Sequence, residues 1–288
     1  MASMRDIKRR KGSIQSTQQI TKAMKLVSTV KLQRAKQNAE KSRDYFRCMY
    51  ETVVSILKKT QNLDHRFLKS GESGKKAVIV ITSNRGLAGG YNSNVIKLVT
   101  RGHLAGEDLA IYAIGKKGKE ALQKQYEIRA DYSDVIEEPA YVDAMAISKT
   151  VLEAFSKGEI SEIYLAYTAF KNTVVHVPTL LKLLPVEVHE EEGAGGEEQE
   201  KGGALMNFEP EDEEALNLLI PKYITSLIYG GMIEAVASEN GARMQAMDSA
   251  TSNAEEMIES LTLLYNRARQ GSITQELTEI IAGANAIS

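Results

Sequence analysis

Residues 3–60 contain one glycine, Gly12, and no proline, and this long run constrains the fold more than any other feature of the chain. Glycine and proline are the residues that most readily interrupt a helix, so the run predicts a single helix. Ser3 and Asp6 have a spacing similar to that of a capping box at its start. At about 1.5 Å per residue the helix would be roughly 80 Å long, more than twice the diameter of a small domain. We therefore expect it to protrude from a globular part.

A second long helix is predicted over residues 210–288. Pro210 is followed by four carboxylates, which is typical of a helix start, where proline fits the first turn and acidic side chains face the positive end of the dipole. Apolar residues then recur at spacings of three and four, beginning with Leu216 and Leu219. Two such long helices cover their narrow apolar stripes by lying side by side. Because a compact region separates them in sequence, we predict an antiparallel coiled coil.

The middle of the chain alternates strand and helix signals. Strand-like apolar runs and helix-like segments occur in turn at 77–81, 95–99, 109–114, 116–125, 140–155, 163–170 and 174–184. This alternation predicts a Rossmann-like α/β domain with a largely parallel sheet, inserted between the two helices. Pro178 places the last strand at an edge or a bend.

The expected domain boundaries follow from this pattern. The N-terminal shaft helix covers 1–60, a linker 61–74, the α/β domain 75–209 and the C-terminal shaft helix 210–288. Within the domain, residues 190–203 are rich in glutamate and glycine, and we expect an acidic flexible loop because such a segment has nothing to bury.

Charge is distributed unevenly, although the whole chain carries a formal charge of only −2 at pH 7. Residues 1–47 hold 13 basic and three acidic side chains, whereas 187–214 hold 12 acidic side chains and one lysine. This asymmetry favours an acidic partner for the N-terminal helix. Cys48 is the single cysteine, so an internal disulfide and a multi-thiolate metal site are excluded, and a reducing compartment fits. No apolar run approaches the roughly 20 residues of a membrane-spanning helix.

A glycine-rich segment at Ser83–Asn92 (SNRGLAGGYN) is the strongest enzyme-like feature. Turns of this kind between a strand and a helix can hold phosphate on backbone N–H groups. The segment has neither the ending of a Walker loop nor the G-x-G-x-x-G spacing of a dinucleotide fold. We therefore interpret it as a structural turn, with Arg85 as the residue that most favours a stand-alone nucleotide-binding protein. The sequence brings no nucleophile close to a general base, so no catalytic site is expected.

The basic N-terminal helix has three interpretations. A transit peptide is basic and poor in acids, but this helical pattern continues past residue 50, too far for a removable leader. A nucleic-acid-binding protein would use Arg9, Arg10 and their basic neighbours on phosphates, although no aromatic residue for base stacking precedes Tyr45. The third interpretation, a protein partner with an acidic rim, is favoured by the length of the helix.

Four segments resemble the gamma-subunit family of F-type ATP synthases. They are Thr17–Val27 (TQQITKAMKLV), Arg85–Asn92 (RGLAGGYN), Glu239–Asn253 (ENGARMQAMDSATSN) and the C-terminal signature Ile273–Ala286 (ITQELTEIIAGANA). The resemblance covers essentially the whole chain. It implies a non-catalytic central rotor shaft that couples proton translocation to ATP synthesis or hydrolysis.

The resemblance also implies partners and contact residues. The terminal helices would enter a ring of three alpha and three beta subunits, which hold ATP, ADP and magnesium, so no cofactor is expected on this chain. The α/β domain would contact the epsilon subunit and the membrane c-ring. Neither nucleic acid nor direct membrane insertion is expected. Contacts with beta subunits would come from two groups of residues. Lys22, Met24 and Lys25 would lie near an acidic beta loop. Arg243, Gln270 and Thr274 would meet another beta loop higher in the ring. Arg9, Arg10 and Arg85 are further candidate contacts.

Two departures from the wider family refine the expectation. The paired-cysteine insert of plant plastid members is missing, so a redox switch is not expected. The lack of a removable leader favours a bacterial protein, bound peripherally on the cytoplasmic side of the cell membrane.

Overall fold

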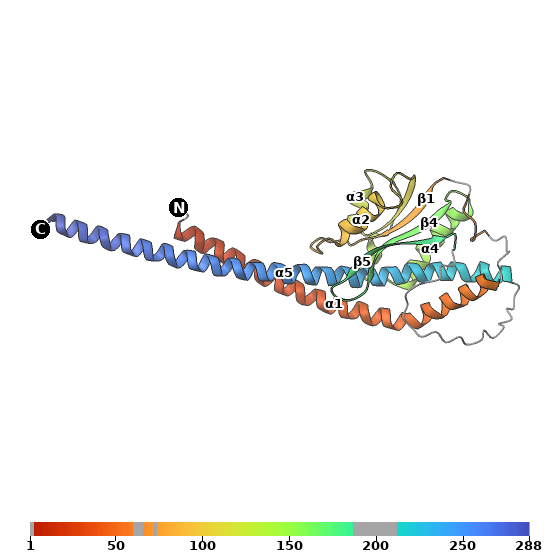
Figure 1. Ribbon diagram of the computed structural model, residues 1–288, viewed down its shortest axis with the longest axis horizontal. Helices are drawn as coiled ribbons and strands as arrows, with labels where there is room; N and C mark the ends of the chain where they lie inside the picture. Colours follow the sequence, from red (N-terminus) through yellow and green to blue (C-terminus); the bar gives the residue numbers. More distant parts are fainter. Residues whose placement is uncertain (1–2, 60–65, 72–73, 187–211, 288) are drawn as a thin grey trace. The chain divides into compact units, whose positions relative to one another are not determined.

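The computed structural model describes residues 3–59, 66–71, 74–186 and 212–287 (Figure 1). The elements are α1 (Met4–Lys59), β1 (Lys76–Ile81), α2 (Tyr91–Arg101), β2 (Leu109–Ile114), α3 (Lys116–Leu122), β3 (Glu127–Asp131), the 3-10 helix η1 (Ser133–Ile136), α4 (Tyr141–Ser156), β4 (Glu162–Phe170), β5 (His176–Leu184) and α5 (Asp212–Ile287). The proposed acidic loop at 190–203 lies outside the described residues, as do residues 61–65 and 72–73 of the proposed linker.

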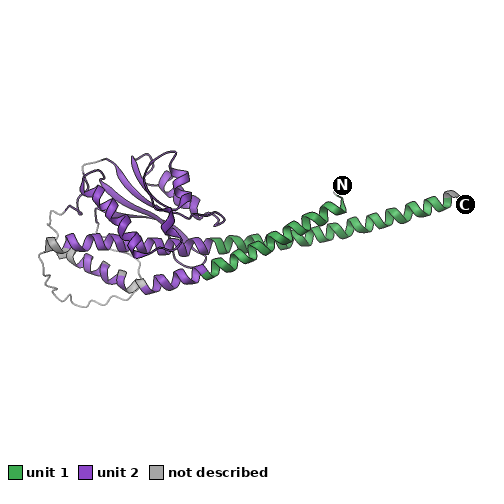
Figure 2. Cartoon of the chain, turned by 180° about the vertical axis from the view of Figure 1, so that it is seen from behind, with its two compact units in different colours: residues 1–30, 243–288 green, residues 31–242 purple. Residues whose placement is uncertain are grey.

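The chain divides into two compact units (Figure 2). Residues 1–30 and 243–288 form one unit, which we call the helix pair, and residues 31–242 form the other, which we call the α/β unit. Both α1, with 56 residues, and α5, with 76 residues, contribute to each unit. The predicted fold class, long terminal helices with an inserted α/β sheet, is confirmed.

The α/β unit contains a five-stranded sheet in the order β3-β2-β1-β4-β5. Strand β1 pairs in parallel with β2 and β4, and β2 pairs in parallel with β3, whereas β4 and β5 are antiparallel. Pro178 lies in the edge strand β5, as predicted, where a missing N–H is tolerated. The sequence did not predict β3 (EIRAD), the opposite edge, because its side chains alternate between exposed and half-buried without an apolar run.

Both faces of the sheet are covered. Ala77, Ile79 and Ile81 of β1 belong to the core shared with α4 and the first part of α5, while Val78 and Val80 belong to the core shared with α2. A strand covered on both faces is apolar at consecutive positions, which explains the AVIVI run. The α/β unit is therefore a three-layer arrangement with loops at the ends of its strands.

An ion cluster stabilises the amino-terminal end of β4. The Glu162 carboxylate lies 3.1 Å from Lys182 Nζ and 3.4 Å from Lys76 Nζ, and it accepts a 3.1 Å hydrogen bond from the Tyr164 hydroxyl. Burial alone would raise the pKa of Glu162, but the bonds from Lys182, Tyr164 and Lys76 outweigh burial and hold the pKa below its ordinary value. The ionised carboxylate therefore stabilises the folded α/β unit.

We predict that Glu162→Gln destabilises the α/β unit by about 1–2 kcal/mol at pH 7, because Lys76 and Lys182 each lose one carboxylate partner. A carboxylate with a depressed pKa contributes stability above its unfolded pKa and loses it as the pH falls through the folded value. The difference from wild type should therefore shrink below about pH 4. Urea unfolding followed by tyrosine fluorescence at pH 7 and pH 3.5 measures it. Glu120→Gln is the control, since Glu120 forms an exposed 2.7 Å pair with Lys117, and a similar loss there would contradict the prediction.

Candidate partner surface of the helix pair

In the helix pair, α1 and α5 run antiparallel. Lys25 Nζ lies 2.6 Å from Asp248 Oδ1, and Lys22 Nζ lies 3.1 Å from Glu255 Oε1, so residue numbers rise along one helix as they fall along the other. Gln18 donates a 2.9 Å hydrogen bond to the same Glu255 oxygen. The predicted antiparallel pairing is confirmed for this unit.

The seam between the two helices repeats every seven residues. The α1 positions at this spacing are all buried or half-buried: Ile7, Lys11, Ile14, Gln18, Thr21, Lys25 and Ser28. The matching positions of α5 are Met247, Thr251, Ala254, Ile258, Leu261, Tyr265, Ala268 and Ser272. This is the period of a coiled coil, but α1 supplies mostly polar side chains, and the buried Thr21 and Thr251 hydroxyls share a 2.7 Å hydrogen bond. Such a seam fixes the register while burying little apolar surface.

Large apolar side chains face outward from the helix pair. In α1 they are Ile20, Leu26, Val27 and Val30, and each of these is more than half exposed. In α5 they are Met257, Leu263, Leu264, Ile273, Leu277, Ile280 and Ile281. Ile273, Leu277 and Ile280 lie at helical spacing within α5, but nothing in the described chain covers them. Clustered exposed apolar side chains indicate a surface that meets another protein.

The predicted contact residues of α1 lie together. Lys22 and Lys25 are partly exposed and form the ion pairs with α5, and the half-buried Met24 lies between them in sequence. Arg9 and Arg10 are exposed one to two turns from the start of α1, and Arg9 is 3.5 Å from Asp6. These cations line one helix whose outer side chains also include the exposed apolar set.

The predicted contact residues of α5 differ in exposure. Gln270 and Thr274 are exposed in the last part of the helix, where a partner can reach them. Arg243, in contrast, is only 9% exposed. Sequence reasoning missed the outward apolar residues such as Val27 and Val30, because which side chains face the seam depends on the register between α1 and α5.

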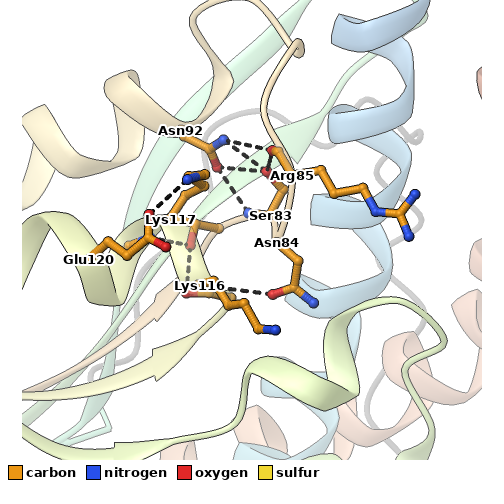
Figure 3. Close-up of polar contacts among 10 residues, drawn as sticks. Ser83, Asn84, Arg85, Asn92, Lys116, Lys117 and Glu120 are labelled. Atoms are coloured by element: carbon orange, nitrogen blue, oxygen red, sulfur yellow. Dashed lines mark hydrogen bonds and ion pairs between the residues drawn. The ribbon is translucent and has the colours of Figure 1, made fainter. Parts of the chain in front are cut away.

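The glycine-rich segment satisfies its own polar groups (Figure 3). The Ser83 N–H donates to Asn92 Oδ1 at 2.9 Å, the Ser83 hydroxyl donates to the Arg85 carbonyl at 2.6 Å, and Asn92 Nδ2 donates to Ser83 Oγ at 2.8 Å. Asn84 bridges two elements, because its Oδ1 accepts the Lys116 N–H at 3.0 Å and its amide donates to the Ser133 carbonyl at 2.8 Å. These bonds support the interpretation as a structural turn.

Arg85 points away from this network, and its guanidinium lies 3.6 Å from Glu137 Oε1 (Figure 3). It belongs to the α/β unit and not to the helix pair. Close to the loop, hydrogen bonds from Lys119 and Ser133 lower the pKa of Asp131 and keep it ionised. Arg85 and Asp131 thus each have an oppositely charged partner within the chain.

In the described residues, no group of three or more histidine, cysteine, aspartate or glutamate side chains could hold a metal ion. None of the described helices is long and apolar enough to cross a membrane.

Comparisons with known proteins agree over the whole length. The family model described as "ATP synthase" matches residues 3–287. The ATP synthase gamma chain of Lachnoclostridium phytofermentans is 65% identical, with 100% of both chains covered. The gamma chain of Alkaliphilus metalliredigens is 46% identical over 99% of this chain and 98% of its own, and a sodium-ion-specific gamma chain of Acetobacterium woodii is 42% identical over 99% of both.

Solved structures give the same fold. A chain of the Euglena gracilis mitochondrial ATP synthase, described as OSCP/F1/c-ring, is 19% identical, with a TM-score of 0.67 over 99% of this chain and 94% of that one. A chain of the Tetrahymena thermophila mitochondrial ATP synthase, described as central stalk/c-ring, is 25% identical, with a TM-score of 0.58 over 80% of this chain and 99% of that one.

Proposed function

The chain belongs to the ATP synthase gamma-chain family, and from this premise we propose that its helix pair turns inside a ring of three alpha and three beta subunits. As a member of the family it is the rotor subunit of the central stalk, which has no catalytic site and binds no cofactor itself. ATP, ADP and magnesium then belong to the alpha and beta subunits. The rotation couples proton translocation to ATP synthesis or, in reverse, hydrolysis to pumping.

The single observation that carries this proposal is the surface of the helix pair. Its polar seam keeps two helices in register, and its outer face presents apolar side chains such as Val27, Val30 and Leu263 to a partner. An asymmetric shaft in contact with three equivalent neighbours biases each toward a different conformation as it turns. Coupling between distant sites requires such a differential contact.

We assign the contacts with beta subunits to both helices of the pair. The acidic loop of one beta subunit meets Met24 between Lys22 and Lys25, with Arg9 and Arg10 nearer the start of α1. Gln270 and Thr274 meet another beta loop on the exposed part of α5. Arg243 joins these contacts through the exposed remainder of its side chain.

The α/β unit meets the other partners in the proposal, which are the epsilon subunit and the c-ring. Arg85 is a candidate contact there, because its side chain is 75% exposed and directed away from its own loop. The complex is bound peripherally at the cytoplasmic face of a bacterial cell membrane. A related chain bears a sodium-specific name, so the coupling ion is tested separately, by whether sodium changes ATP-driven pumping.

We predict that the purified chain hydrolyses no ATP, and that alpha and beta subunits form a coupled complex only when it is present. Its glycine-rich loop uses the Ser83 hydroxyl and the Asn84 and Asn92 amides in hydrogen bonds within the chain, and it lacks the Walker and dinucleotide motifs that bind phosphate. Copurification with a ring of larger subunits, followed by ATPase and pumping assays, tests this. Turnover by the chain alone, after removal of contaminating ring subunits, contradicts the prediction.

Two alternative functions predict different results in binding experiments. A stand-alone nucleotide-binding protein would bind ATP as the isolated chain, which calorimetry detects. A nucleic-acid-binding protein would bind DNA with a steep salt dependence through the basic part of α1. The ion pairs of Lys22 and Lys25 with α5 already use two of those cations, which favours the rotor over this alternative.

A further inference from the structure

A groove of about 530 Å³ runs between α4 and residues 221–225 of α5 in the α/β unit. Its floor is apolar and is formed mainly by Phe67, Tyr141, Leu152 and Pro221. Aromatic packing holds the floor in place, because the Tyr141 ring meets Tyr229 edge to face at 5.7 Å, and the Phe67 ring lies 6.3 Å from that of Phe155. The groove is therefore preformed and large enough to receive several side chains.

Exposed apolar side chains extend the groove along α4. Met145, which lines it, is 49% exposed, and Val142, three residues earlier, is 66% exposed. Residues three apart are neighbours on a helix surface, so the two form one strip with the groove. An apolar strip that continues beyond the cavity fits an elongated partner better than a small molecule.

One polar group inside the groove has no partner. Ser148 lines the groove and is 1% exposed, and its hydroxyl makes no hydrogen bond within the described residues. A buried hydroxyl without a partner costs about 1–3 kcal/mol.

The rim of the groove is positively charged. Arg66, Lys149, Lys157 and Lys222 surround it, against the single carboxylate of Glu153. Lys149 and Glu153 are 4.0 Å apart and largely exposed, so this pair neutralises little of the field. Charge complementarity therefore favours a partner that carries carboxylates beside its apolar side chains.

We propose that this groove docks an amphipathic helix of another subunit of the complex, with apolar side chains facing Met145 and Leu152 and carboxylates facing Lys149 and Lys157. A helix laid between two helices is a common way to bury such a groove. The 16 residues of α4 offer a bed of roughly 24 Å, about four turns of a partner helix. The inference rests on the proposed function, because the partner helix belongs to another subunit of the assembled complex.

Hydroxyl-radical footprinting of the isolated chain and of the assembled complex tests the proposal. Modification of Met145 and Val142 should slow by about fivefold or more in the complex, because a docked helix excludes water. Val174, which is 65% exposed outside the groove, is the comparison position. Equal labelling of Met145 in the two states overturns the proposal.

A photo-crosslinker at position 145 then identifies what covers the groove. A crosslink to a helix with acidic residues beside its apolar face supports the proposal, and one to any other kind of segment overturns it. Lys149→Glu with Lys157→Glu should weaken the protection about tenfold, as expected from reversed charge pairs, whereas Val174→Glu should not. Equal protection in all variants overturns the charge assignment and the proposal with it.

The chain's own residues 187–211 are the competing occupant, since they are acidic and follow Val186, whose N–H binds the Phe67 carbonyl at 3.1 Å. Protection of Met145 already present in the isolated chain, and lost when 190–203 are deleted, overturns the proposal in favour of that segment. Footprints are taken only from complexes with ATPase activity. A chain that never assembles refutes the proposed function. An assembled complex in which Met145 is labelled as fast as in the isolated chain refutes only the docking site.

Discussion

Replacing Met24 by lysine is expected to impair coupling while part of the ATPase activity remains. Met24 is half-buried between Lys22 and Lys25, and both of these lysines already have carboxylate partners on α5. A lysine at position 24 adds a cation without such a partner. Its ammonium is then available to the acidic beta loop of the proposed complex.

The physical reason for the defect is an interaction that is too strong for a moving contact. A charged hydrogen bond in a partly desolvated interface is worth about 1.5–3 kcal/mol. If it forms in one rotational state only, it lengthens that dwell by about tenfold or more. We expect the number of protons pumped per ATP hydrolysed to fall several-fold, and rotation assays to record the longer dwell.

Matched variants separate charge from packing. Met24→Leu keeps an apolar side chain of similar volume and should be near normal. Lys22→Ala removes one partly exposed ion pair worth about 0–1 kcal/mol and should reduce coupling only modestly. Equal defects in the lysine and leucine variants would show that packing volume at position 24 governs the contact.

Replacing Gly115 by alanine should cost more than about 3 kcal/mol of unfolding free energy, the largest loss that we expect from a single methyl group in this chain. Gly115 joins β2 to α3 with φ at +105°, a conformation that other residues rarely adopt. A Cβ there would lie 2.1 Å from the Thr82 carbonyl oxygen and 2.6 Å from its carbon. Both atoms belong to the backbone at the end of β1, so neither can move aside without disturbing the sheet.

Two other glycines separate the causes of that loss. Gly106 also has a positive φ, +87°, but a Cβ there meets nothing within 4 Å, so Gly106→Ala should cost only about 1–2 kcal/mol of backbone strain. Gly86 has neither a positive φ nor a close neighbour, and Gly86→Ala should stay within about 0.5 kcal/mol of wild type. Urea unfolding of the three variants measures the series. Similar losses at 115 and 106 would contradict a role for the Thr82 carbonyl.

Local sequence patterns predicted most of the fold because its elements are long or strongly apolar. The runs at 77–81 and 109–114 became β1 and β2, and the run of residues with one glycine became α1. Strand β3 could not be predicted, because an edge strand with charged alternation gains its stability from pairing with β2 and not from its own residues. The short 3-10 helix η1, which follows β3, likewise depends on the packing of β3 against β2 and not on its own residues.

The partner surface was only partly predictable. The motifs located Met24 and its lysines, but which side chains face the seam depends on how α1 and α5 are registered. The pairs of Lys22 with Glu255 and Lys25 with Asp248 join residues more than 220 positions apart, and no local pattern contains that information. For the same reason Ile273 and Leu277, which are apolar at helical spacing, could not be identified as exposed.

The last part of α5 extends past the seam, and every side chain from 273 to 285 is exposed. A solitary helix of about this length is marginal in water, because nucleation is costly and no packed face repays it. In the proposed complex its order would come from the ring of alpha and beta subunits that receives it. On that proposal the tip is the last piece of the rotor to fold, and the last part of α5 in an unassembled chain should be the part most sensitive to protease. Synthesis in excess of the ring subunits would thus be corrected by degradation, without any dedicated signal.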